Sequence, residues 1–147
     1  MKVAVGSDHA GFELKENIRQ FLTDQGVTME DIGTYSKESV DYPDYAQKVS
    51  ALVQEGKVDF GILICSTGVG MCMTANKIHG IRASLAWTPD IARLSRQHNN
   101  ANVLCLAGNF LEHGTAQEIV KTFLNSSFDG GRHEHRVGRM MELEDNR

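Results

Sequence analysis

Short apolar runs alternate along the chain with longer segments in which apolar residues recur every three or four positions. The runs span residues 2–6, 27–32, 60–65, 81–86 and 102–107. The third run contains consecutive aliphatic residues, which is typical of a strand covered on both faces of a parallel sheet. Five strand–helix units in succession predict an α/β fold, a three-layer, doubly wound sandwich with a five-stranded parallel sheet and right-handed crossovers.

The segments between the runs have the starts and apolar faces of amphipathic helices. Pro43 suits the first turn of the second helix, and Thr88-Pro89 is typical of an N-cap followed by proline. The helix after Pro89 is expected over residues 90–97. The residues predicted to face the core are Leu14, Ile18, Phe21 and Leu22; Tyr45, Val49, Leu52 and Val53; Ile91, Leu94 and Ser95; and Ala116, Ile119, Val120, Phe123 and Leu124.

Residues 130–147 do not fit the strand–helix unit. They predict one more helix, with Val137, Met140 and Leu143 on one side. We therefore expect a single domain over residues 1–147 that ends in a C-terminal helical extension. The apolar side of this arm has to be buried, and the surface of a second subunit is one place for it.

The stretch over residues 60–77 gathers the chemistry of the chain around one cysteine. Cys65 falls at the carboxyl end of the third strand, the edge where open α/β sheets bind ligands. Gly68 and Gly70 allow the following backbone to turn its N–H groups towards an anion, and a helix that starts near Gly70 would favour the thiolate of Cys65. Cys65 is thus a candidate nucleophile or base. A small buried cysteine that closes a strand remains the alternative.

Other polar residues stand at the ends of predicted elements. Asp8 and His9 follow the first strand as Cys65 follows the third, although Asp8 could equally cap the next helix. His98 ends the fourth helix and is a candidate catalytic residue, but a cation at a helix C-terminus is favourable on its own, so His98 could instead be a cap. Arg132 and Arg136 lie four positions apart on one helix face and suit a phosphate, but a solvated tail with two surface arginines explains the same spacing.

Several well-known sites are excluded by spacing. The predicted sheet is Rossmann-like, yet the third glycine of the dinucleotide fingerprint would fall at Met73. A cysteine phosphatase of the Cys-x5-Arg type would need arginine at Met71. Cys65 and Cys72 lack the paired ligand spacing of a zinc site. We therefore predict neither a metal ion nor a cofactor.

Composition narrows the class of protein further. The 147 residues carry a net charge of −4, which argues against a general nucleic-acid binder. The first residues lack the apolar stretch of a signal peptide, and no segment approaches the ~20 apolar residues of a membrane span. Three cysteines, an odd number, suggest a reducing compartment. We expect a cytoplasmic protein without structural disulfides and without membrane or nucleic-acid partners.

Seven short motifs, in register from one end of the chain to the other, resemble the type B ribose-5-phosphate isomerases. The wider family also holds galactose-6-phosphate isomerase subunits. The motifs are Gly6-Ser7-Asp8-His9-Ala10-Gly11, Val40-Asp41-Tyr42-Pro43, Ile64-Cys65-Ser66-Thr67-Gly68-Val69-Gly70, Ala75-Asn76-Lys77, Gly80-Ile81-Arg82-Ala83, Ser95-Arg96-Gln97-His98-Asn99 and Gly130-Gly131-Arg132-His133.

This resemblance implies an isomerase that interconverts ribose 5-phosphate and ribulose 5-phosphate, acting as a homodimer with its site at the subunit interface; a tetramer stays open. Cys65 would move the proton between C1 and C2 through a cis-enediolate, and Thr67 and His98 would assist ring opening. His9 and the two arginines would hold the phosphate, with the arginines from either chain. The implied contacts with the phosphorylated sugar come from Asp8, His9, Ser66, Gly68, Val69, Gly70, Asn99, Arg132 and Arg136.

The chain departs from the family pattern at a few positions. Some members have a glutamate base where this chain has Met71, which leaves Cys65 as the base. Ser66 and Ala107 replace glycines, and Asn109 stands where many members have an arginine that helps to hold the phosphate. Six-carbon sugar phosphates therefore stay open as substrates, and a non-catalytic phosphosugar-binding module stays open as a different class of function.

Overall fold

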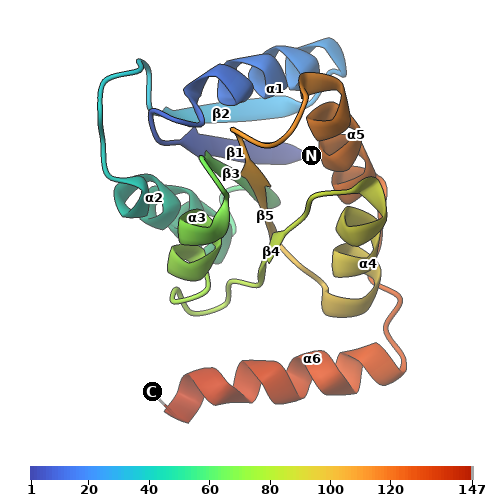
Figure 1. The fold of residues 1–147 in the computed structure, drawn as a ribbon. Coiled ribbons are helices and arrows are strands. Elements are labelled where there is room, and N and C mark those ends of the chain that lie inside the picture. Colours follow the sequence, from blue (N-terminus) through green and yellow to red (C-terminus); the bar gives the residue numbers. More distant parts are fainter. Residues whose placement is uncertain (147) are drawn as a thin grey trace.

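The computed structural model describes residues 1–146. Within them, five parallel strands form one sheet in the order β2-β1-β3-β5-β4 (Figure 1). The strands are β1 (Lys2–Ser7), β2 (Thr28–Gly33), β3 (Phe60–Cys65), β4 (Ala83–Leu85) and β5 (Val103–Ala107). The predicted parallel sheet is confirmed, with β3 at its centre, although β4 is shorter than the expected run.

The helices are α1 (Phe12–Asp24), α2 (Tyr42–Gln54), α3 (Val69–Ala75), α4 (Pro89–Asn99), α5 (His113–Asn125) and α6 (Arg132–Glu142), followed by a 3-10 turn, η1 (Leu143–Asn146). Helices α1, α4 and α5 cover one face of the sheet, and α2 and α3 cover the other (Figure 1). The three-layer, doubly wound arrangement is therefore confirmed. Among residues 1–146, no helix is both long enough and apolar enough to cross a membrane.

Alternate residues of β3 point to the two faces of the sheet. Ile62 and Ile64 pack in the core with α1 and α5, and Leu63 and Cys65 pack in the core with α2 and α3. All of these side chains are at most 5% exposed. The continuous apolar run thus reflects a strand that is buried on both faces.

Helix α4 begins as predicted but buries a different side. The N–H of Ile91 donates to the Thr88 hydroxyl at 3.2 Å, so Thr88 is the N-cap. Ser95 is buried as expected, but Ile91 and Leu94 are half-buried; the other residues that α4 buries are Ala92 and Arg96. The reason is Arg96, whose guanidinium group lies over the rings of Phe60 and Phe123 at 4.7 and 5.8 Å from their centroids.

At the outer side of the edge strand β4, main-chain groups pair with a side chain instead of with a further strand. The N–H of Ala83 donates to Oδ1 of Asn76 at 2.8 Å, and Nδ2 of Asn76 donates to the carbonyl of Ala83 at 3.0 Å. One residue earlier, the N–H of Arg82 donates to Oδ1 of Asn102 at 2.8 Å. Main-chain groups at the start of this strand are therefore satisfied without a neighbouring strand.

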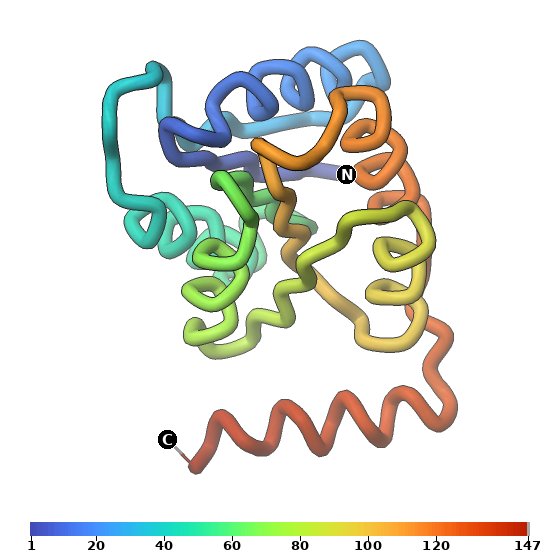
Figure 2. The backbone as a smooth tube through the Cα atoms, in the orientation of Figure 1, coloured from blue at the N-terminus to red at the C-terminus, as the bar shows by residue number. Residues whose placement is uncertain are grey.

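Helix α6 leaves the sheet and runs beneath it, as the backbone path shows (Figure 2). The arm meets the body through Glu144 of η1, which accepts hydrogen bonds from the N–H of Gly80 at 3.0 Å, and through contacts between α6 and α4. The predicted apolar side is poorly covered, since Met140 is 42% exposed and Leu143 is 65% exposed. The C-terminal helical extension is thus present with its apolar side largely open.

Candidate functional site

Three strand ends meet at the carboxyl edge of the sheet. The N–H of Asp8, just after β1, donates to the carbonyl of Ile64 at 3.2 Å, and the N–H of Gly108, just after β5, donates to the carbonyl of Cys65 at 2.8 Å. The turn after β1 comes so close to β3 that a Cβ at Gly11 would lie 2.4 Å from the Ile64 oxygen. Asp8 and Cys65 therefore share one edge, as the sequence predicted.

Cys65 ends β3 and is followed by the predicted glycine turn. Its side chain is 5% exposed and packs on the α2 and α3 side. Gly68 has a left-handed φ of 76°, and a Cβ there would lie 2.6 Å from the Leu85 side chain. Val69 starts α3 within one residue of the expected position, and its N–H donates to the Thr67 hydroxyl at 3.2 Å. The conformation of this turn thus requires glycine.

Tyr42 covers one side of the turn and was not selected from the sequence. It is the first residue of α2, and a Cβ at Gly70 would lie 2.5 Å from its ring. The ring is 39% exposed, so it stands at the rim of the carboxyl edge. The available signal was its place directly before Pro43 in one of the seven motifs.

Asp8 and His9 have partners in neighbouring segments. Asp8 is buried, and its Oδ1 accepts a hydrogen bond from the N–H of Gly11 at 3.0 Å, so it supports the turn into α1. Nδ1 of His9 accepts a hydrogen bond from the N–H of Val40 at 3.2 Å. An imidazole that accepts at Nδ1 carries its proton on Nε2, so His9 can donate from that atom to an anion. The Val40 contact was not foreseen.

His98 lies at the opposite, amino-terminal edge of the sheet. Helix α4 runs back from the carboxyl end of β4, and its 11 residues span about 16 Å. Arg96 and Asn100, at the end of α4, line a hollow shared with Met1 and Phe60, which stand at the starts of β1 and β3. Within one chain, His98 is therefore separated from Cys65 by the length of the sheet.

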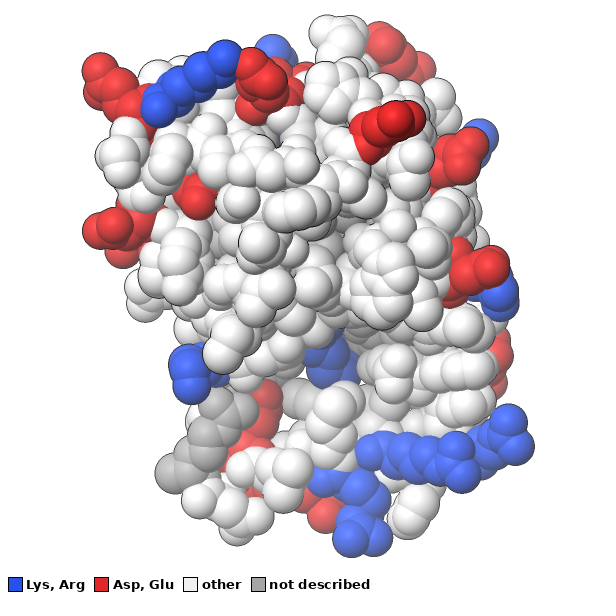
Figure 3. All heavy atoms as spheres, in the orientation of Figure 1, with Lys and Arg blue, Asp and Glu red and all other residues white. Residues whose placement is uncertain are grey.

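Four predicted site residues gather around this second position. The rings of His98 and His133 stack with centroids 4.1 Å apart and planes 11° apart. Both histidines, Asn99 and Arg136 line a cavity of about 270 Å³, and Arg132 is exposed at the start of α6. Figure 3 shows blue Lys and Arg atoms gathered at this end of the molecule. His133 was missed, although it follows Arg132 in the last motif.

The cluster of His98, Asp129 and His133 suits an anion better than a metal ion. Its ligand atoms lie within 4.8 Å of one another. The two rings are almost parallel, however, so the lone pairs in their planes do not converge on one point. Partial burial lowers the pKa of His133, and the charges of His98, Arg132 and Arg136 lower it further, against an opposing effect of Asp129. This positive surrounding disfavours a cation.

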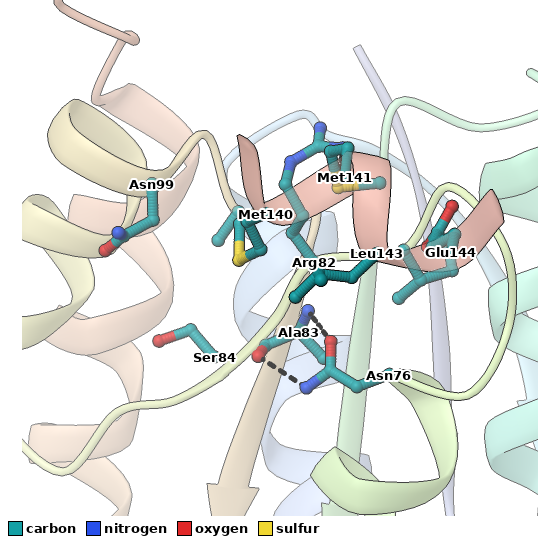
Figure 4. A pocket seen from close by; sticks show the side chains of 11 residues that line it. Asn76, Arg82, Ala83, Ser84, Asn99, Met140, Met141, Leu143 and Glu144 are labelled. Atoms are coloured by element: carbon teal, nitrogen blue, oxygen red, sulfur yellow. Dashed lines mark hydrogen bonds between the residues drawn. The ribbon is translucent and has the colours of Figure 1, made fainter. Parts of the chain in front are cut away.

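A larger cavity of about 370 Å³ lies between α6 and the amino-terminal edge (Figure 4). Met140, Met141 and Leu143 of the arm form one wall, and the hydrogen-bonded pair of Asn76 and Ala83 stands on the other side. Arg82 reaches across to the arm, where its Nη1 lies 3.8 Å from Sδ of Met141. Nε of Arg82 donates to the carbonyl of Asn100 at 2.8 Å, and desolvation lowers the pKa of its guanidinium group. Neither this cavity nor the previous one contains Cys65 in its lining.

The other two cysteines differ from each other. Cys105 is fully buried, and this burial raises the pKa of its thiol well above the usual range. Cys72 is half-buried; a hydrogen bond from Cys105 lowers the pKa of its thiol to about 7, with a smaller contribution from the main chain at Leu85 and against the opposing effect of burial. Cys105 is therefore a packing residue, whereas Cys72 is ionisable near neutral pH.

The fold and the carboxyl edge define a class of protein. It is a doubly wound α/β protein that presents a cysteine and a glycine turn at the end of its central strand, where such sheets bind ligands. The chain belongs to the Ribose/Galactose Isomerase family, whose sequence model matches residues 3–140. The family resemblance and the fold class predicted from the sequence are thus confirmed.

Relatives match over almost the whole chain. Ribose-5-phosphate isomerase B of Escherichia coli is 46% identical over 99% of this chain and 98% of its own length. A crystal structure of a ribose 5-phosphate isomerase from Thermotoga maritima superposes with a TM-score of 0.95 at 54% identity, covering 96% of this chain and 97% of that one. Ribose-5-phosphate isomerase B from Mycoplasma genitalium, solved with bound ribulose-5-phosphate, gives a TM-score of 0.94 at 40% identity over 99% of this chain and 97% of that one.

Proposed function

We propose that this chain is an aldose–ketose isomerase that interconverts ribose 5-phosphate and ribulose 5-phosphate. Family membership and the names of its relatives in Escherichia coli and Mycoplasma genitalium support the reaction and the substrate. The observation that carries the proposal is the position of Cys65, which stands beside Asp8 and a glycine turn at the ligand-binding edge of the sheet.

Cys65 would act as the base. Its thiolate takes the C2 proton of the open-chain aldose, the C–H electrons form the C1–C2 double bond, and the negative charge moves to O1. The O2 proton passes to O1, and the Cys65 thiol returns its proton to C1 to complete the ketose. Met71, the nearby buried alternative, has no basic atom for this step. The total charge of the site stays constant, so main-chain N–H groups of the turn accelerate the reaction only if they favour the enediolate over the thiolate.

A complete site would combine two chains. Thr67 and Cys65 lie at the carboxyl edge, whereas His98, Arg132 and Arg136 gather at the amino-terminal edge of the same chain. Ring opening by Thr67 with His98, and phosphate binding by His9 with the arginines, each need groups from both positions. We therefore propose a homodimer in which the second group of one subunit faces Cys65 of the other.

The surface offers an interface for this homodimer. Three apolar side chains beside the turn, Val69, Met73 and Trp87, are 45%, 64% and 60% exposed. Figure 3 shows that the face over α3 and β4 carries few Lys, Arg, Asp or Glu side chains. Met140 and Leu143 of the arm are exposed as well. A second copy that covers these residues would remove them from water, which favours association.

Substitution of Cys65 tests the proposed chemistry. Cys65→Ala removes the base, so we expect loss of isomerisation by at least a hundredfold with an unchanged circular dichroism spectrum. Wild type in deuterium oxide should incorporate deuterium at C1 of ribulose 5-phosphate, as measured by proton NMR. Cys105→Ala serves as the matched control because its thiol is buried away from the carboxyl edge. Retention of more than a few per cent of activity by Cys65→Ala would contradict the assignment.

A substrate panel separates the remaining alternatives. An isomerase of six-carbon sugar phosphates would turn over those compounds with the higher kcat/KM, and a phosphosugar-binding module would bind them without deuterium incorporation. We also propose a cytoplasmic location, because a cysteine that works as a thiolate needs a reducing compartment. The cysteines at 65, 72 and 105 are free thiols, which agrees with that setting.

A further inference from the structure

Two main-chain hydrogen bonds extend the pairing of β3 and β5 beyond the strands. Cys65 and Ala107 are the last paired residues. The N–H of Gly108 then donates to the carbonyl of Cys65 at 2.8 Å, and the N–H of Asn109 donates to the carbonyl of Ser66 at 3.1 Å. Because these bonds join main-chain atoms, they hold the segment after Cys65 in place regardless of the side chains at positions 66 and 109.

A third bond at the same place depends on the side chains. Nδ2 of Asn109 donates to Oγ of Ser66 at 2.7 Å. Ser66 is partly exposed and Asn109 is exposed, so the pair lies on the open side of the carboxyl edge. Ser66 is also the immediate neighbour of Cys65. The bond therefore acts on a hydroxyl group at the mouth of the proposed active site.

The direction of this bond determines what the Ser66 hydroxyl can do. A serine hydroxyl has one proton to donate and two lone pairs that can accept. The amide nitrogen of Asn109 can only donate, so Ser66 is the acceptor and its own proton stays available. Within residues 1–146, the Ser66 hydroxyl donates no hydrogen bond of its own. The contact thus restrains the Ser66 side chain while leaving its donor free.

We propose that Asn109 is a positioning residue that holds the Ser66 hydroxyl ready to donate a hydrogen bond to an oxygen of the bound sugar phosphate. This inference rests on the proposed function, because it needs that sugar at Cys65. The Ser66 hydroxyl supplies a neutral donor at the same carboxyl edge that carries the buried Asp8 carboxylate. The oxygen belongs either to the reacting C1–C2 group or to the phosphate, and the two cases are separable by experiment.

A double-mutant cycle on kcat/KM tests the coupling between the two residues. Ser66→Ala removes one neutral hydrogen bond to substrate, and we expect about a tenfold loss. Asn109→Ala leaves the hydroxyl present but free to rotate, so a loss of about threefold is expected. In the Ser66→Ala background, Asn109→Ala should cause no further loss. Gln117→Ala is the matched control, since it removes a 2.8 Å side-chain bond to Asn17 between α5 and α1.

Asn109→Asp separates positioning from simple tethering. An aspartate of the same shape accepts the Ser66 proton, so the contact persists with its direction reversed and the hydroxyl can no longer donate to substrate. We expect about a tenfold loss of kcat/KM with an unchanged melting temperature. The added negative charge could also repel the phosphate, but that effect would persist in the Ser66→Ala background. The positioning effect would vanish there, so the cycle distinguishes the two.

Two outcomes would overturn the inference. One is a kcat/KM of Ser66→Ala that equals that of wild type. The other is a loss of kcat/KM from each Asn109 variant that is the same in the wild-type and in the Ser66→Ala background. Repeating the cycle with unphosphorylated ribose identifies the oxygen: a loss confined to ribose 5-phosphate places the bond at the phosphate, and an equal loss places it at C1–C2. Failure of wild type to isomerise ribose 5-phosphate would instead refute the proposed function. The cycle would then be run on the Kd of ribulose 5-phosphate by calorimetry, with the same criteria.

Discussion

A thiol reacts as its thiolate, so the surroundings of each sulfur decide which cysteine of this chain an alkylating reagent modifies. Cys65 is 5% exposed at the end of β3, whereas Cys72 is half-buried on α3 with a pKa of about 7. Cys105 is buried, and its raised pKa keeps it a thiol. The sequence suggested a single reactive cysteine, and the structure adds Cys72 as a second.

This difference predicts a labelling pattern with iodoacetamide. Because the folded pKa of Cys72 lies below that of an ordinary thiol, its modification should rise as the pH increases through about 7 and level off above it. Peptide mass spectrometry should locate label on Cys72 and Cys65 but not on Cys105. Activity should be lost at the same rate as Cys65 is modified. Ribose 5-phosphate should slow the modification of Cys65 and leave the rate of Cys72 modification unchanged.

The variant Cys72→Ser serves as the control for this experiment. It should keep its activity and still be inactivated by iodoacetamide at Cys65. If inactivation of wild type instead followed Cys72 and disappeared in Cys72→Ser, the base would have been assigned to the wrong cysteine.

Two of the departures from the family pattern, at positions 66 and 109, are in direct contact. Ser66 and Asn109 are 43 positions apart in the chain, yet Nδ2 of Asn109 lies 2.7 Å from Oγ of Ser66. Sequence reasoning treated them as separate changes because it lacked the pairing of β3 with β5. Replacing Asn109 with arginine therefore removes this hydrogen bond at the same time as it adds a cation.

At the scale of the elements, the glycine turn before α3 has little room for a side chain. Gly68 has a φ of 76°, and a Cβ there would lie 2.6 Å from the Leu85 side chain and 3.0 Å from the main chain of Leu106. A side chain would thus be strained by its dihedral angle and would also press against β5. The turn that supports Cys65 should be sensitive to a single methyl group.

Gly68→Ala is therefore expected to lower the free energy of unfolding by about 1–3 kcal/mol and to reduce kcat/KM by at least tenfold. Urea denaturation and a coupled isomerase assay measure the two effects. The matched control is Gly114→Ala in α5, where a Cβ would meet open space. It should raise the stability by about 0.5 kcal/mol and leave the activity unchanged. Equal behaviour of the two variants would show that the turn tolerates a side chain.

The periodicity of apolar residues predicted the strands and helices well, because each apolar run and each apolar helix face reflects local burial. The five parallel strands, the Thr88 cap and the α5 face all follow from such patterns. The position of β5 between β3 and β4 did not, since strand order depends on contacts between distant segments. The face of α4 was wrong in part for a similar reason: Ser95 is buried as predicted, but the fit of Arg96 over two aromatic rings turns Ala92 inward in place of Ile91 and Leu94.

The sequence predicted the residues at each of the two positions of the candidate site, but not how the two positions are arranged within one chain. Residues that follow strands β1 and β3 necessarily share an edge, so Asp8 and Cys65 could be placed together from the chain. His98 lies in the last turn of a helix that runs back across the sheet, which puts it at the other edge. The resemblance implied a site at the subunit interface but left open which chain supplies the arginines.

At the scale of the whole molecule, two surface regions bear on the proposed homodimer. One region combines the Cys65 edge with exposed Val69, Met73 and Trp87, and another combines the basic start of α6 with the stacked pair of His98 and His133. In a symmetric dimer, each subunit would present both regions to its partner. Two equivalent composite sites would result, each with its base from one chain and its phosphate-binding arginines from the other.

Mixing two inactive variants tests this arrangement directly. Cys65→Ala removes the base, and Arg136→Ala weakens phosphate binding, so at low substrate each parent homodimer should be poorly active. In a mixed dimer with composite sites, one site carries both substitutions and the other carries neither. Random exchange makes about half of the dimers mixed, each with one intact site of two, so activity should rise towards about a quarter of wild type. If the arginines instead serve their own chain, every site of a mixed dimer carries one substitution, and mixing restores no activity. Native mass spectrometry confirms that the subunits have exchanged, so a lack of rescue in exchanged dimers would contradict the composite site.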